Sequence, residues 1–169
     1  SNPNMCEQRV INNFFSALFH DLPEAVTRDI ISPVKQATDD LPNIVKKIEN
    51  EIVSKELVPL MENFFVQEII DYTSDEFSNR IKNDSGKIQN VSWEELNTKY
   101  NQNKYFPIDG RLVRIADHLS ALMEADISIT HGITSVHLIN GRDGILYSYK
   151  DSEIINGINV FSLFNDIVS

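Results

Sequence analysis

The feature that most constrains the fold is a short polar cluster that follows an apolar helical repeat. Four apolar residues recur at three- and four-residue spacing and predict an amphipathic helix over residues 8–21: Ile11, Phe14, Phe15 and Leu18. The cluster that follows runs from Phe19 to Asp29 and holds one imidazole, three carboxylates and one cation. On a straight helix, His20 and Glu24 share the side opposite the apolar repeat. Phe19 adds an apolar residue on a third side, so the helix is apolar on most of its circumference. The sequence therefore predicts a buried helix whose polar groups face an enclosed pocket.

Two interpretations of this cluster follow from its residue types. An unpaired buried charge is costly, so a histidine grouped with carboxylates in a pocket indicates a shared divalent metal ion. The alternative is a helix cap, in which Asp21 is the N-cap residue, Glu24 closes a capping box and Pro23 occupies the first helical turn. The cap explains Pro23 without a metal, since a proline inside a helix costs about 3 kcal/mol. It leaves His20 and Asp29 unexplained, so both interpretations remain open at this point.

Length and composition predict one globular domain that covers residues 1–169. The chain is 41% hydrophobic and 24% charged, which is ordinary for a soluble protein. The single cysteine, Cys6, excludes an internal disulfide framework and suits a reducing, cytoplasmic setting. No apolar run reaches membrane-spanning length, and a net charge of −10 argues against long nucleic acids and anionic membranes as partners. A small phosphorylated partner remains compatible, because local cations and a metal can override the global field.

Helical spacing continues along most of the chain. Apolar residues with this spacing predict helices within residues 41–53, 61–72, 111–125, 138–149 and 160–167. The segment 78–104 is rich in Asn, Lys, Ser, Asp and Gly, and we expect a mobile polar insertion there. Within it, Ser92 and Glu95 have capping-box spacing and predict a short helix. For residues 138–149, Asn140-Gly141 and Asp143-Gly144 allow a hairpin as the alternative, and we favour the helix.

One acid in the helix 111–125 lies on an unexpected face. Asp117 falls among Val113, Ser120 and Ala121 on the helical wheel, away from Arg114 and His118. An acid among small and apolar neighbours is either buried and paired with an arginine or the ligand of a metal ion. The histidines outside the first cluster, His118, His131 and His137, are interpreted as structural or surface residues.

These features together resemble the HD superfamily of metal-dependent phosphohydrolases, whose site combines a His, a His-Asp pair and a distant Asp. The resemblance is closest to the bacterial HD-domain 5′-deoxynucleotidases, whose signature is His-Asp, two residues, Glu, four residues, Asp, and later Pro-Val-Lys. This sequence has His20-Asp21, Glu24, Asp29 and Pro33-Val34-Lys35 in that order, and the helix around Asp117 resembles the final ligand helix. The resemblance covers residues 8–126. It implies an all-α, HD-domain helical bundle, with room for a small irregular or hairpin segment at the C-terminus.

The resemblance also implies roles for individual residues. His20, Asp21 and Asp117 would be the ligands of one divalent ion, for which mixed His and carboxylate ligands suit Mn, Co, Ni, Fe or Zn. Glu24 would hold or deprotonate a metal-activated water, and Asp29 would relay a proton or contact the sugar. Two cations are candidates for phosphate contact, with ordinary solvated side chains as the alternative: Arg28 and Lys35. The implied activity is hydrolysis of nucleoside monophosphates or similar small phosphate esters.

The chain departs from the family pattern at its start. The family's first histidine comes from an upstream helix, and none of the nineteen residues before His20 is a histidine. We therefore expect an N-terminally truncated domain with weak or no activity in this form. The alternative function is a non-catalytic HD-like domain whose incomplete metal site has a structural or ligand-binding role. Loss of the upstream helix would expose apolar surface around Phe14, Phe15 and Phe19, which predicts a homodimer or larger homo-oligomer.

Overall fold

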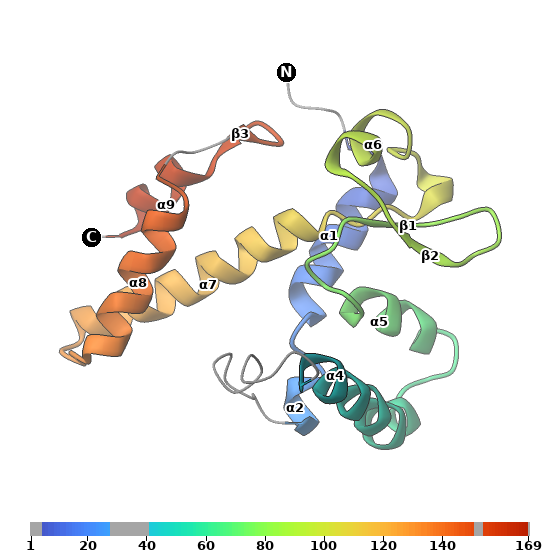
Figure 1. Cartoon of the computed structure of the whole chain (residues 1–169), viewed down its shortest axis with the longest axis horizontal. Coiled ribbons are helices and arrows are strands. Elements are labelled where there is room, and N and C mark those ends of the chain that lie inside the picture. The colour runs from blue at the N-terminus through green and yellow to red at the C-terminus, as the bar shows by residue number, and fades with distance from the viewer. Residues whose placement is uncertain (1–4, 28–40, 151–153, 169) are drawn as a thin grey trace. The chain divides into compact units, whose positions relative to one another are not determined.

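The computed structural model of the chain describes residues 5–27, 41–150 and 154–168. This part of the chain is mostly helical, which confirms the predicted all-α class with a small C-terminal hairpin (Figure 1). The α-helices are α1 (Glu7–Phe19), α2 (Glu24–Thr27), α4 (Leu41–Ile52), α5 (Val66–Thr73), α6 (Trp93–Thr98), α7 (Gly110–Thr130), α8 (Val136–Ser148) and α9 (Val160–Ile167). None of the described helices is both long and apolar enough to cross a membrane.

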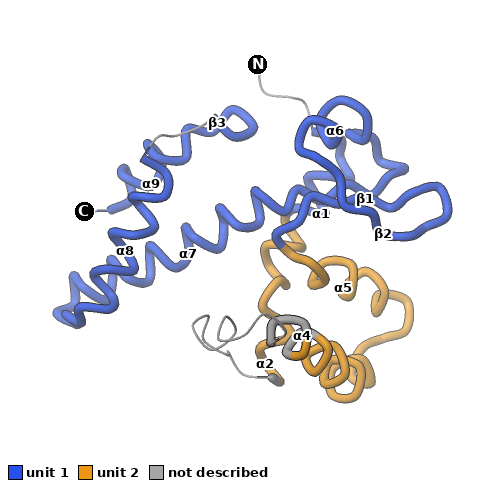
Figure 2. Tube along the Cα trace, in the orientation of Figure 1, with its two compact units in different colours: residues 1–13, 77–169 blue, residues 14–76 orange. Residues whose placement is uncertain are grey.

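Shorter elements connect these helices. A π-helical turn (Val53–Leu57) and a 3-10 turn (Val58–Leu60) follow α4, and a second 3-10 turn (Asn103–Tyr105) precedes α7. The described residues also form two antiparallel hairpins: β1 (Arg80–Lys82) pairs with β2 (Ile88–Asn90), and β3 (Ile154–Ile155) pairs with β4 (Ile158–Asn159). The chain divides into two compact units, residues 14–76 and residues 1–13 with 77–169, and the boundary falls inside α1 (Figure 2).

The unit 14–76 contains the last turns of α1 together with α2, α4 and α5. Its core is aromatic: the ring of Phe15 stacks on Phe19 at 5.9 Å and on Tyr72 of α5 at 5.7 Å between centroids. Tyr72 is only 5% exposed, so α5 is held against the end of α1 through this stack. The run of helical turns that starts with α4 ends at Leu60. Pro59, in its last turn, has no amide hydrogen and cannot donate a helical hydrogen bond.

Helix α1 buries its polar side, and the sequence prediction of a buried apolar face was wrong. Three polar residues of α1 are 0% exposed, namely Arg9, Asn12 and Ser16, whereas Phe14 is 63% exposed. For two of these residues the reason is that their polar atoms find partners: Arg9 pairs with Asp109, and the Asn12 amide donates to the carbonyl of Pro107 at 3.1 Å.

The end of α1 also differs from the prediction. The helix stops at Phe19, and a turn over residues 20–23 separates it from α2. His20 and Glu24 therefore do not share one face of a single straight helix.

The unit formed by residues 1–13 and 77–169 is organised around α7. Its core joins α7, the C-terminal hairpin and α9 through five buried side chains: Ile115, Leu122, Ile155, Val160 and Phe164. Asp109 is the N-cap of α7, and its side chain accepts a hydrogen bond from the Leu112 amide at 3.2 Å. A Cβ atom on Gly110 would clash with the backbone of Phe77, so only glycine fits at the first position of α7.

The C-terminal segment forms the predicted helices. Residues 138–149 were predicted as helical, and α8 confirms this, so Asn140-Gly141 and Asp143-Gly144 do not form a hairpin. The hairpin lies further along, between β3 and β4, where Asn156 and Gly157 both have positive φ angles of 50° and 83°. Positive φ at both central positions is the requirement of a type I′ turn, which Asn-Gly adopts readily.

The polar segment 78–104, which we predicted as a mobile insertion, contains β1, β2 and α6. These elements enclose a small core made of Ile81, Leu96 and Tyr100. Ser92 is the N-cap of α6: its hydroxyl accepts from the Glu95 amide at 3.1 Å, and the Glu95 carboxylate accepts from the Ser92 amide at 3.0 Å. The predicted capping box is therefore confirmed.

Candidate functional site

The candidate site begins with the histidine that follows the last residue of α1. His20 Nδ1 lies 2.9 Å from the carbonyl oxygen of Ala17, one turn earlier. A carbonyl oxygen only accepts, so Nδ1 carries a proton in this contact and a neutral ring presents its lone pair at Nε2. Metal-ligating histidines commonly use this arrangement, because the second nitrogen's hydrogen bond fixes the tautomer and the ring orientation. The His20 side chain is only 12% exposed, so its ring is largely enclosed by the protein.

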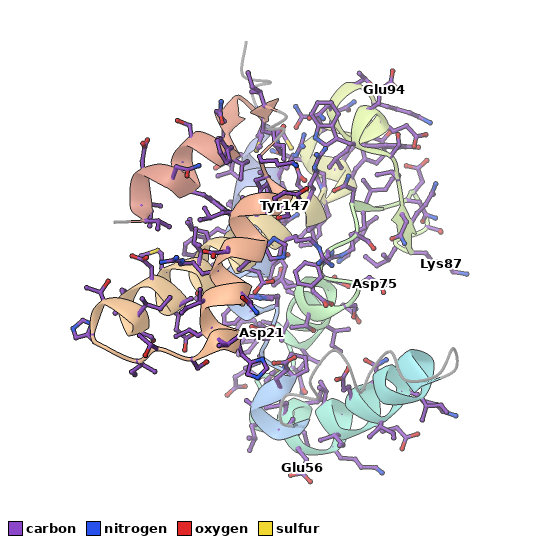
Figure 3. The ribbon with its side chains drawn as sticks, turned by 60° about the vertical axis from the view of Figure 1, so that its left-hand side comes forward. Asp21, Glu56, Asp75, Lys87, Glu94 and Tyr147 are labelled. Atoms are coloured by element: carbon purple, nitrogen blue, oxygen red, sulfur yellow. The ribbon has the colours of Figure 1, made fainter. Side chains whose placement is uncertain are left out.

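Asp21 supplies the second candidate ligand. Its Oδ2 atom lies 3.2 Å from His20 Nε2, and its side chain is 64% exposed. Figure 3 labels the Asp21 side chain. A carboxylate oxygen and an imidazole lone pair at this distance need a cation between them, which is either a proton on Nε2 or a metal ion. Two ligands bound about 2.1 Å from one ion would lie about 3.0–3.4 Å apart in octahedral or tetrahedral geometry. The separation of these two atoms fits a shared divalent ion.

The turn after α1 brings Glu24 to the start of the next helix. The Leu22 amide donates to the Phe19 carbonyl and the Glu24 amide donates to the Asp21 carbonyl, both at 2.9 Å. Pro23 thus lies in the turn, and α2 begins at Glu24. In these hydrogen bonds Asp21 acts through its backbone carbonyl, while its side chain lies beside His20. The Asp21 carboxylate therefore accepts none of these turn hydrogen bonds, and its place beside His20 fits either an ion pair with a protonated imidazole or a shared metal ion.

Asp117 lies in the middle of α7 and is half-buried. The next residue, His118, has its Nδ1 atom 2.8 Å from the hydroxyl of Tyr149, and the two rings meet edge to face. Burial lowers the pKa of His118, an effect that Asp117 opposes and Arg114 reinforces. His118 is therefore engaged within the packing of α7, as we predicted from the sequence.

The structure brings together some of the predicted site residues. His20 and Asp21 lie side by side, with Glu24 after them, in the unit 14–76. Asp117 belongs to the other unit, so its convergence with His20 and Asp21 remains a prediction. The predicted catalytic Asp29 and the predicted phosphate contacts Arg28 and Lys35 lie outside the described residues.

A buried polar network at the start of α7 was not predicted from the sequence. Arg9 Nη2 and Asn156 Nδ2 both donate to Asp109 Oδ2 at 2.8 Å, and Arg9 and Asp109 are fully buried. Arg9 Nη1 also donates to Asn97 Oδ1 of α6 at 2.9 Å. One pattern could have revealed it, because Arg9, Asn12 and Ser16 recur at helical spacing and form a continuous polar face on α1.

Comparison with known protein families identifies the family of the chain. A family model described as the HD domain matches residues 1–145 of the chain. No curated protein and no solved structure matches the sequence. The matched range includes both stretches that carry the predicted ligands, His20-Asp21 and Asp117.

Proposed function

The chain belongs to the HD domain family, whose members are generally metal-dependent phosphohydrolases, and we propose that it hydrolyses small phosphate esters such as nucleoside monophosphates. One observation carries this proposal: His20 Nε2, presented by the hydrogen bond from Nδ1 to Ala17, lies 3.2 Å from Asp21 Oδ2. Together the two atoms form one side of a divalent-ion site. Asp117, a half-buried acid inside the matched range, is the third ligand in this proposal.

Each of the remaining residues has a separate role in the proposed reaction. The ion, one of Mn, Co, Ni, Fe or Zn, supplies Lewis acidity and lowers the pKa of water when it is bound. Glu24 accepts the proton of the attacking water, a contribution of about 10²–10⁴-fold for a positioned general base. Asp29 relays a proton or contacts the sugar, and two cations contact the phosphate: Arg28 and Lys35.

The substrate and the setting follow from charge and composition. A net charge of −10 disfavours binding of long nucleic acids, which depends on neutralising many phosphates, but permits a single small phosphate ester. Within the family we propose the branch of the 5′-deoxynucleotidases, because His20-Asp21, Glu24, Asp29 and the segment 33–35 match its signature. The single cysteine supports a cytoplasmic setting.

We also propose that the chain forms a homodimer through α1. Four apolar residues of this helix are exposed, at 40–63% of their surface: Val10, Ile11, Phe14 and Leu18. A contiguous apolar stripe of this kind marks an interaction surface, and two-fold dimers are the commonest closed assemblies.

Metal content and turnover test the proposed activity together. Purified protein is loaded with Mn, Co, Ni, Fe or Zn, its bound metal is measured, and hydrolysis of a panel of nucleoside monophosphates is assayed. We expect binding of up to one divalent ion per chain and a slow release of inorganic phosphate, in line with the weak activity predicted from the sequence, and both are lost in His20→Ala. His137→Ala is the matched control, because His137 is exposed and lies in α8. Metal binding without hydrolysis of any panel member would favour the alternative, a non-catalytic metal-holding domain.

A further inference from the structure

The C-terminal half of α7 and the end of α9 form a second site that the proposed reaction does not use. A cavity of about 260 Å³ lies there, lined by Met123, Asp126, Ile127, Thr130, His131 and Ile167. All six residues belong to the unit 1–13 with 77–169, and none of them is among the predicted metal ligands. The walls are mainly apolar, so the chemistry of the cavity is set by its three polar side chains.

Asp126 is the most unusual of these side chains. The residue is 7% exposed, and its carboxylate has one ionic neighbour among the described residues, Arg142 Nη1 at 3.5 Å. That guanidinium is directed mainly at Asp143, to which Nε and Nη2 donate at 3.1 and 3.0 Å. A buried carboxylate normally has close hydrogen bonds to compensate its lost hydration. Asp126 thus borders the cavity, and its carboxylate can accept further hydrogen bonds from a ligand.

The other two polar side chains, Thr130 and His131, already donate their hydrogen atoms to backbone carbonyls. The Thr130 hydroxyl donates to the Asp126 carbonyl at 2.9 Å, which leaves its oxygen lone pair as an acceptor. His131 Nδ1 lies 2.8 Å from the Ile127 carbonyl and must donate to it, so the neutral ring presents Nε2 as an acceptor. Met123, Ile127 and Ile167 have no side-chain N–H or O–H. The cavity therefore offers hydrogen-bond acceptors and no side-chain donor.

From this geometry we infer that the cavity binds a small organic cation, an amine or amidine with N–H donors on a compact apolar body. The cation pairs with Asp126, additional N–H groups reach Thr130 and His131, and the apolar body packs on Met123, Ile127 and Ile167. The cavity volume lies just below the usual range for ligand pockets, about 300–1,000 Å³, which restricts the ligand to a small molecule. The net charge of −10 further favours accumulation of cations at the protein.

Three aromatic probes of one shape but different charge test the inference on the wild-type chain. Benzamidine is a cation with four N–H donors, benzamide is neutral with two, and benzoate is an anion with none. By isothermal titration calorimetry we expect benzamidine to bind at least about tenfold more tightly than benzamide, the effect of one charge-assisted hydrogen bond. Benzoate should show no binding. Equal affinity for the three probes, or no binding of benzamidine, would overturn the inference.

Two further measurements locate the bound cation. Asp126→Asn should weaken benzamidine about tenfold or more, whereas Glu124→Gln, an exposed acid of the same helix, should leave the affinity unchanged. If Asp126→Asn fails to fold, nuclear magnetic resonance of wild-type protein replaces it. Benzamidine should then shift the imidazole nitrogen signals of His131 and leave those of His137 in place. Saturation without any shift at His131 would show that the probe binds elsewhere and would overturn the assignment.

Discussion

At the residue scale, the end of α1 determines the chemistry that His20 can perform. The carbonyl of Ala17 lies in the last turn of α1, where carbonyl groups generally lack an intrahelical amide partner, and it accepts a hydrogen bond from His20 Nδ1. This contact orients the ring and leaves Nε2 beside Asp21, so two adjacent residues present two ligand atoms to one point. A helix that continued through residue 21 would have kept this carbonyl for a backbone amide.

The proposed base can be tested by one isosteric change. Glu24→Gln removes the ability to accept a proton while keeping the shape of the side chain, so hydrolysis should fall by about 10²–10⁴-fold. Metal content should remain close to that of wild type, because Glu24 is not a proposed ligand. The measurement is the rate of phosphate release together with bound metal. Glu56→Gln, an exposed acid of the same unit, is the control, and equal rates in both variants would remove Glu24 from the mechanism.

The stability of the unit 14–76 should depend on alkaline pH through Tyr72. Burial, together with Glu68 and Asp71, raises the pKa of Tyr72 from 10.0 to about 12. The pKa of Tyr72 is higher in the folded state than in the unfolded state, so the protonated hydroxyl adds to the free energy of unfolding. This contribution is complete below pH 10 and is lost as pH rises through about 12. Denaturant unfolding over this range should show a smaller alkaline loss of stability in Tyr72→Phe than in wild type. Tyr147→Phe, at an exposed position, should behave as wild type; identical alkaline losses in all three proteins would contradict the prediction.

At the element scale, sequence periodicity predicted the positions of helices better than the direction in which they face. The spacing of Ile11, Phe14 and Leu18 identifies α1, and Ser92 with Glu95 identifies α6, because these are local patterns. The buried face of α1 could not be predicted in this way, since it depends on partners about a hundred residues away, such as Asp109. A tertiary hydrogen bond leaves no local periodic signal.

The same limit applies to the candidate site. His20-Asp21 was found because its two residues are adjacent in sequence and one signature contains both. The actual turn over residues 20–23 was missed, because the prediction assumed a straight helix. The residues that line the second cavity were not grouped by the sequence either. They come from α7, the turn after it and α9, which packing alone brings together.

The buried pair of Arg9 and Asp109 should dominate the stability of its unit. Arg9→Met leaves the fully buried Asp109 carboxylate without its cation and should cost about 3–5 kcal/mol in the free energy of unfolding. Adding Asp109→Asn removes that charge, so the double variant should cost clearly less than the sum of the two single variants. Urea unfolding of the four proteins measures the coupling. Lys87→Met, at an exposed position of the β1–β2 hairpin, should change stability by less than about 0.5 kcal/mol. Additive single costs would show that the pair does not act as a unit.

At the scale of the whole molecule, each of the two units has its own hydrophobic organisation. The unit 14–76 relies on the aromatic stack of Phe15, Phe19 and Tyr72, whereas the other unit relies on a cluster of mainly aliphatic side chains that packs with Phe164. Helix α1 belongs to both units: it carries Arg9 in one unit, and its last residue in the other unit is Phe19, which precedes His20. Its exposed stripe is the part of this helix that neither core covers.

The proposed homodimer makes a specific prediction about that stripe. Val10, Phe14 and Leu18 follow one another at four-residue spacing, so a two-fold axis at Phe14 would pair the stripe with its own copy in antiparallel orientation. The stripe contains no charged residue, and two chains of net charge −10 can approach there with less repulsion than elsewhere. Analytical ultracentrifugation should therefore give the mass of a dimer for wild type.

Leu18→Glu should shift this equilibrium to the monomer, because the dimer would bury two like charges near its interface. Leu60→Glu makes the same chemical change at a residue that is 82% exposed and lies outside α1, and it should leave the dimer intact. A wild-type chain that sediments as a monomer at every concentration would contradict the proposal. A dimer that both variants retain would place the contact on another surface, because the stripe would then contribute no binding energy.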